Sequence, residues 1–185
     1  MSVKVDIKRA QDIMELFDAT PRQAQIVMWR AITRAATAGR TRASMNVRKN
    51  YMVSANDVKK TIKISKKSSA TLSANFRSVG SVIPLIDFDT TPQEPSPAAV
   101  RTRVSKAGGK KNISNAFVAR PSSSGKVHVF TRVGTSRYPL KVLYGPSVPQ
   151  MIGREDIMDD ILNRTQTVLN DRLDHELERL LRGQF

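Results

Sequence analysis

Apolar residues recur three and four positions apart, the spacing of one helix face, in two long segments near the two ends of the chain. The first covers residues 24–47. Thr20 and Pro21 precede it and are typical of a helix start, because a threonine hydroxyl caps free amides and proline has no amide hydrogen to lose. The second covers residues 154–182 and keeps its carboxylates outside the apolar stripe. That stripe contains Ile157, Ile161, Val168, Leu177, Leu180 and Leu181. The pattern predicts one long helix on each side of the centre.

Between these helices apolar and polar positions alternate, with the two-residue period of a half-buried strand. Ser54, followed three residues later by Asp57, predicts a capped short helix over residues 54–60. Pro84 makes residues 81–88 an edge strand or an irregular crossing. Strands are predicted over residues 2–7, 61–66, 70–77, 115–120, 126–132 and 138–144. The order predicts an α+β fold in which long N-terminal and C-terminal helices pack on a mostly antiparallel β-sheet.

Residues 89–114 differ from their surroundings and predict an extended, flexible basic loop or arm within a single domain of residues 1–185. The segment begins with several prolines, which cannot donate ladder hydrogen bonds, and later contains a basic, glycine-rich stretch. In between, Val100, Thr102 and Val104 alternate with Arg101 and Arg103. This alternation predicts a hairpin that projects arginines from one face.

Charge is concentrated in the centre of the chain. The whole sequence carries a net charge of +15, but residues 21–150 contain 23 Lys and Arg against four acidic residues, a net charge of +19. Such an excess attracts polyanions, although a solvated basic face is the alternative. The residues expected to face DNA are Arg30, Arg34, Arg40, Arg42, Arg101, Arg103, Lys106, Lys110 and Lys111.

Catalytic chemistry has little support in the sequence. There is no cysteine, and the two histidines lie at an alternating strand position and on a helix. Glu155, Asp156 and Asp159 suggest a metal-dependent nuclease as one alternative, but acids also favour a helix N-terminus through the helix dipole. We therefore expect no catalytic, cofactor-binding or metal-binding residues. We also expect no membrane span, because no apolar run approaches the roughly 18 residues that one needs.

The segment Arg132–Met151, with its Gly145-Pro146-Ser147 turn after an arginine-rich strand, resembles the phage minor tail protein Z family of tail-completion proteins. The long alanine-rich helix, the segment 83–88 and the closing amphipathic helix follow in the order of that family. The resemblance covers most of residues 20–182.

The resemblance implies a non-enzymatic virion protein, made in the host cytoplasm. It implies a head-to-tail connector subunit at the head-proximal end of a long tail, with the tail terminator and head-completion or connector proteins as partners. It also implies a homo-oligomer, expected to be a hexameric ring around passing DNA. It implies a structural turn at Gly145, Pro146, Ser147 and Pro149, where the prolines fix two backbone angles and the glycine permits an unusual one. The alternative is a protein that binds nucleic acid independently of sequence.

Overall fold

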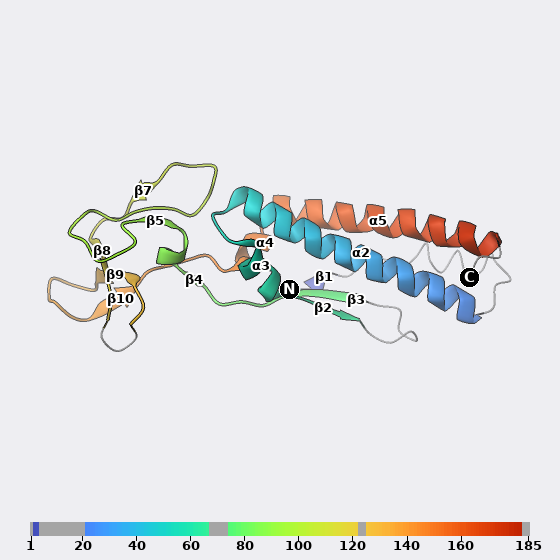
Figure 1. The fold of residues 1–185 in the computed structure, drawn as a ribbon, viewed down its shortest axis with the longest axis horizontal. Helices are drawn as coiled ribbons and strands as arrows, with labels where there is room; N and C mark the ends of the chain where they lie inside the picture. The colour runs from blue at the N-terminus through green and yellow to red at the C-terminus, as the bar shows by residue number, and fades with distance from the viewer. Residues whose placement is uncertain (1, 4–20, 67–73, 122–124, 183–185) are drawn as a thin grey trace.

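The computed structural model describes residues 2–3, 21–66, 74–121 and 125–182, and it has an elongated shape with two parts (Figure 1). The helical part contains two long antiparallel helices, two short ones and a small sheet. The β part, residues 83–145, extends beyond one end of the long helices. The predicted α+β class is confirmed, but the described strands form four small sheets with antiparallel pairing rather than one sheet.

The two long helices are α2 (Pro21–Asn50) and α5 (Glu155–Leu181). They lie side by side, and α2 begins at the predicted proline, whereas Thr20 is outside the described residues. The buried cluster between them contains Val27, Met28, Ala31, Ile32, Ala35, Leu169 and Leu173. On α5 the buried stripe includes Ile157, Ile161 and Val168 as predicted and continues through Leu173, while Leu177 is half-buried. The side chains of Leu180 and Leu181 are outside the described residues.

Small residues bring the two helices close together in their middle. A Cβ atom on Gly39 would lie 2.6 Å from the Oγ1 of Thr165, so the Thr165 side chain occupies the space that a larger residue at position 39 would need. The Thr165 hydroxyl is itself buried and donates to the Ile161 carbonyl at 2.7 Å. The small residues Ala31, Ala35 and Gly39 of α2 therefore pack this helix pair within one chain.

The short helix α3 (Ala55–Thr61) starts at the predicted cap, where Ser54 Oγ accepts a hydrogen bond from the Asp57 amide at 3.1 Å. It leads into β2 (Ile62–Lys66), which pairs with β3 (Ala74–Ser78), so the strands predicted over residues 61–66 and 70–77 are neighbours. β1 (Ser2–Val3) joins the other edge of β3. The rest of the predicted strand 2–7 and the first residues of the predicted strand 70–77 are outside the described residues.

The described residues of the β part form three small sheets. The segment around Pro84, residues 83–87, forms a two-residue strand and a 3₁₀ turn, as expected of an irregular crossing. The predicted arm contains three short strands, in which Thr102 is buried between the more accessible Arg101 and Arg103. The strands and turn are β4 (Ile83–Pro84), η1 (Leu85–Asp87), β5 (Asp89–Thr91), β6 (Arg101–Arg103), β7 (Lys111–Asn112), β8 (Ala116–Ala119), β9 (His128–Arg132), β10 (Leu140–Val142) and β11 (Tyr144–Gly145).

A single apolar cluster joins the two parts. It extends from Val47 of α2 through Phe88 and Val129 of the β part to Ile157 and Ile161 of α5. The chain returns to the helical part through α4 (Val148–Ile152), whose Met151 and Ile152 are almost completely buried. The β part is therefore fixed to the helices by a shared core as well as by the chain connections.

Candidate functional site

The nine residues expected to face DNA come from two separate places, the outer faces of α2 and the β6–β7 region of the β part. The structure divides them by what they contact. Some are bound to acidic residues or carbonyls of the same chain, and the others project without a described partner. Only the second group is fully available to another molecule.

Of the four α2 arginines that were expected to face DNA, three connect α2 to other elements. Arg30 Nη1 lies 3.2 Å from the carboxylate of Glu176, which is 7% exposed on α5. Arg40 Nη2 donates to the Lys59 carbonyl of α3 at 3.3 Å. Arg42 binds Asp160 of α5. Since these contacts hold the helical part together, a structural role accounts for them.

The Arg42–Asp160 contact is the best defined of these. Arg42 donates from Nη2 to Oδ1 at 2.7 Å and from Nε to Oδ2, which also accepts from the Asn46 side chain. The hydrogen bond from Arg42, followed by that from Asn46, lowers the pKa of Asp160 from its usual 3.8 to about 2. The same hydrogen bond raises the pKa of Arg42. Both side chains are about two-fifths exposed, so solvent screens the pair.

Arg34 differs from the other three α2 arginines that were expected to face DNA. It is exposed and has no ion pair or hydrogen bond with any residue that the structure describes. It lines a groove of about 360 Å³ between α2 and α5 together with Arg164, Arg172 and Asp171. Arg164 and Arg172 were not among the residues expected to face DNA, because they lie in the acidic C-terminal segment. Their spacing of eight residues, which places them on one helix face, is the signal that could have identified them.

The five basic residues of the β6–β7 region also divide into two groups. Arg103 Nη2 and Lys110 Nζ lie 2.8 Å and 2.9 Å from the two carboxylate oxygens of Asp89. These two cations lower the pKa of Asp89, and the hydrogen bond from Lys110 is the largest cause. In contrast, the side chains of Arg101, Lys106 and Lys111 are exposed and have no ion pair or hydrogen bond with a described residue.

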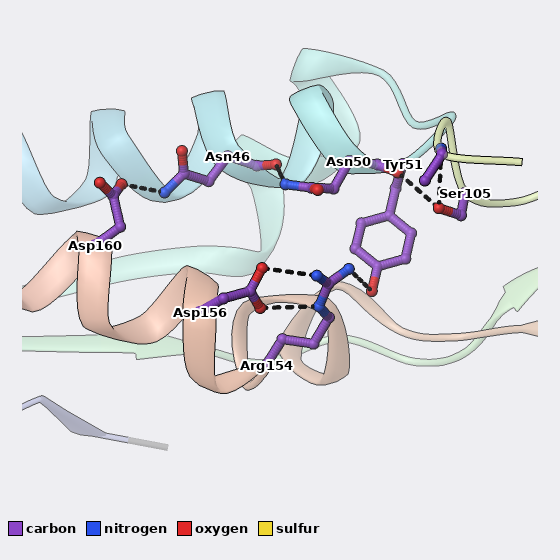
Figure 2. Close-up of polar contacts among 8 residues, drawn as sticks. Asn46, Asn50, Tyr51, Ser105, Arg154, Asp156 and Asp160 are labelled. Atoms are coloured by element: carbon purple, nitrogen blue, oxygen red, sulfur yellow. Dashed lines mark hydrogen bonds and ion pairs between the residues drawn. The ribbon is translucent and has the colours of Figure 1, made fainter.

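The β6–β7 connection is attached to the end of α2 at its base (Figure 2). The Asn50 carbonyl accepts from the Lys106 amide at 2.8 Å and from the Ser105 hydroxyl at 3.3 Å. The Met52 amide donates to the Val104 carbonyl at 2.9 Å. These hydrogen bonds fix the position of the backbone from which the exposed Lys106 side chain projects.

The start of α5 lies next to this junction, and its acids are engaged in part. Arg154 donates to both carboxylate oxygens of Asp156, at 3.0 Å and 2.7 Å, and to the Tyr51 hydroxyl at 3.3 Å (Figure 2). The guanidinium also lies 5.7 Å from the centre of the Tyr51 ring. Within the described ranges no group of three acids or histidines is arranged to hold a metal ion. The geometry therefore adds nothing to the nuclease alternative built on Glu155, Asp156 and Asp159.

The predicted turn at 145–149 lies where β11 meets α4. Ser147 caps α4, because its side chain accepts from the Gln150 amide while the Gln150 side chain accepts from the Ser147 amide at 2.8 Å. Pro149 stands in the first turn of the helix. The expected reason for Gly145 was wrong: among described glycines the left-handed conformation belongs to Gly125. Glycine is needed because a Cβ at position 145 would lie 2.5 Å from the Phe88 ring.

No helix in the described part of the chain combines the length and the apolar character that a membrane span requires. No curated protein and no solved structure matches the sequence. A comparison with protein-family models matches residues 7–184 to the family described as prophage minor tail protein Z (GPZ). The chain therefore belongs to the prophage minor tail protein Z family, and it is a structural component of a phage tail.

Proposed function

We propose that this minor tail protein completes the tail at its head-proximal end. There, several copies form a ring, a hexamer if the ring follows the sixfold symmetry of tails, which joins the tail to the head and surrounds the DNA that passes through. The neighbours of the ring are the tail terminator and the head-completion or connector proteins. Family membership supports a role in the tail, and the distribution of charge supports the position next to DNA.

The observation that carries the proposal is the set of basic residues without internal partners. Arg101, Lys106 and Lys111 project from the β part, and no acidic residue occurs between Glu94 and Glu155. Phosphates therefore meet little repulsion on this part of the surface. Ion pairing with phosphates is indifferent to sequence and weakens with salt, as suits contact with passing DNA.

The experiment is quantitative mass spectrometry of purified phage particles, with the copy number of this chain compared with that of a known tail component. A ring at one end of the tail requires about six copies per particle under sixfold symmetry. Gold-labelled antibody against the chain should bind where head and tail meet. Absence of the chain from intact particles, or gold at the distal tail tip, would contradict the proposal.

The alternative is a free nucleic-acid-binding protein that uses the same exposed basic residues. A gel shift of the purified chain on duplex DNA distinguishes this alternative from the proposed ring subunit. Tight binding that falls steeply between 50 mM and 200 mM salt, a range over which about six phosphate contacts cost roughly a thousandfold in affinity, would favour the alternative. Weak binding at 50 mM salt is the result expected of a ring subunit.

A further inference from the structure

The connection between β9 and β10 carries the most exposed large apolar residues of the described chain. Val133 is 65% exposed and Tyr138 is 66% exposed, and the Arg137 guanidinium lies 5.8 Å from the centre of the Tyr138 ring. This β9–β10 tip (residues 132–141) lies at the end of the β part farthest from the long helices (Figure 1). The tip also carries Arg132 and Lys141. The tip is therefore both apolar and positively charged, and it projects away from the rest of the molecule.

A cleft of about 620 Å³ lies elsewhere on the same molecule, between α3 and the segment that leads into β4. Its apolar lining includes Val53, Ile83 and Pro84, and at its rim Val82 is 47% exposed. Its charged lining consists of Asp57, Asp87 and Lys60. We call it the α3–β4 cleft.

The two acids of the α3–β4 cleft stand out because residues 21–150 contain only four acidic residues. The other two are neutralised internally, Asp89 by Arg103 and Lys110, and Glu94 by Arg120 at 2.9 Å. Asp87 has no ion pair or hydrogen bond with a described residue. Asp57 accepts from the Ser54 hydroxyl at 2.6 Å and has no cation as a described partner. Within residues 21–150, the two carboxylates without a described cationic partner, those of Asp57 and Asp87, therefore both lie at the α3–β4 cleft, which has an apolar lining.

We propose that the β9–β10 tip of one copy docks into the α3–β4 cleft of the next copy. Tyr138 and Val133 would cover Val82 and the apolar lining, and Arg137 would face Asp87. The inference rests on the proposed ring and names the surfaces that build it. Since the tip and the cleft are different surfaces, the contact is head-to-tail, the kind that closes into a ring when the rotation between neighbours allows.

A second copy fits the tip better than DNA does. Phosphates would pair with Arg132, Arg137 and Lys141 but would leave Val133 and Tyr138 exposed. Tyrosine and arginine side by side are typical of the residues that dominate protein–protein binding. The tip of one copy would meet repulsion at the equally basic β part of another, so the acidic cleft is the complementary surface.

The test uses the absence of cysteine from the chain. A variant carrying both Val82→Cys and Tyr138→Cys is oxidised and run on a non-reducing gel, as purified phage particles and as the concentrated, purified full chain. The expected result is a ladder of covalent multimers larger than a dimer, since each copy offers one tip and one cleft. The matched control pairs Tyr138→Cys with Met45→Cys, which is also exposed but lies on α2 outside the cleft, and should give no ladder.

A charge exchange tests the ion pair within the contact. Arg137→Asp alone and Asp87→Arg alone should each lower the cross-linked fraction by about fivefold, because like charges would face each other, and the two together should restore it. Particles that contain the chain but give no ladder would overturn the docking while leaving the ring proposal standing. If the chain is absent from particles, the proposed function fails and the purified chain decides the docking, with no ladder overturning it. If Arg137→Asp reduced DNA binding but left cross-linking unchanged, the tip would be a DNA-binding surface and the docking proposal would also be overturned.

Discussion

Arg42 and Asp160 join the two long helices through a fork of two hydrogen bonds, although 118 positions separate them in the sequence. The folded state holds the pKa of Asp160 at about 2, below the usual 3.8, so the ionised form is favoured by folding. The stabilisation is therefore fully present above about pH 4 and is lost as the pH falls toward 2.

Asp160→Asn should lower the free energy of unfolding at pH 7 by no more than about 1 kcal/mol, because solvent screens this half-exposed pair. The difference between the wild type and the variant should shrink when urea unfolding is repeated at pH 2.5. Asp159→Asn, one residue earlier and without a described ion-pair partner, is the control and should change little at either pH. A difference that grows on acidification would contradict this assignment.

Gly145→Ala should destabilise the protein by about 1–3 kcal/mol, because the new methyl group would overlap the ring of Phe88, which is only 4% exposed. Urea unfolding followed by circular dichroism measures the change. Gly109→Ala is the matched control, since nothing lies within 4 Å of a Cβ atom at that position. Equal stability of the two variants would show that the Phe88 ring has room to move.

Ser147→Ala should cost about 1 kcal/mol of stability, because it removes the cap of α4 and leaves the Gln150 amide without its acceptor. Ser54→Ala removes the cap of α3 in the same way, but Ser54 is exposed and water can replace the lost acceptor. Thermal unfolding should therefore show the larger drop in Tm for Ser147→Ala. The reverse order would mean that burial does not decide the strength of these caps.

Replacing Arg101, Lys106 and Lys111 with Ser should leave the fold intact. Under the proposed function it removes three expected phosphate contacts and should lower the yield of infectious particles by about tenfold. Arg103 and Lys110 are left in place because they bind Asp89. Plaque titre per particle measures the effect, and circular dichroism checks the fold. The control replaces Lys59, Lys63 and Arg77, three exposed basic residues of the helical part, with Ser. Equal titres for the two triple variants would show that total charge matters rather than its place.

Local sequence signals predicted several of the elements, although the single strand predicted over residues 138–144 is two strands, β10 and β11, in different sheets. The start of α2 at Pro21, the cap at Ser54 and the pairing of β2 with β3 each depend on residues close together in sequence. The division of the strands into four sheets could not be predicted, because alternation shows which residues face one side but not which strand pairs with which.

The candidate site was harder to predict because it depends on distant pairs. Of the nine basic residues chosen for their charge, Arg30, Arg42, Arg103 and Lys110 are bound to carboxylates of other elements. A sequence does not show that Glu176 faces Arg30 across a helix pair. Arg164 and Arg172 were missed for the same reason, since their groove exists only when α5 lies against α2.

The helical part is discontinuous in sequence, and this determines the order in which the molecule can form during synthesis. When α2 leaves the ribosome its apolar face, with Val27, Met28 and Ala31, has no helix to cover it, because Leu169 and Leu173 belong to a segment translated later. The β part, residues 83–145, is contiguous and is complete before α5 appears. The nascent chain therefore exposes the apolar face of α2 while more than a hundred further residues are translated, at roughly 5–20 residues per second. A chaperone has that interval in which to protect the face.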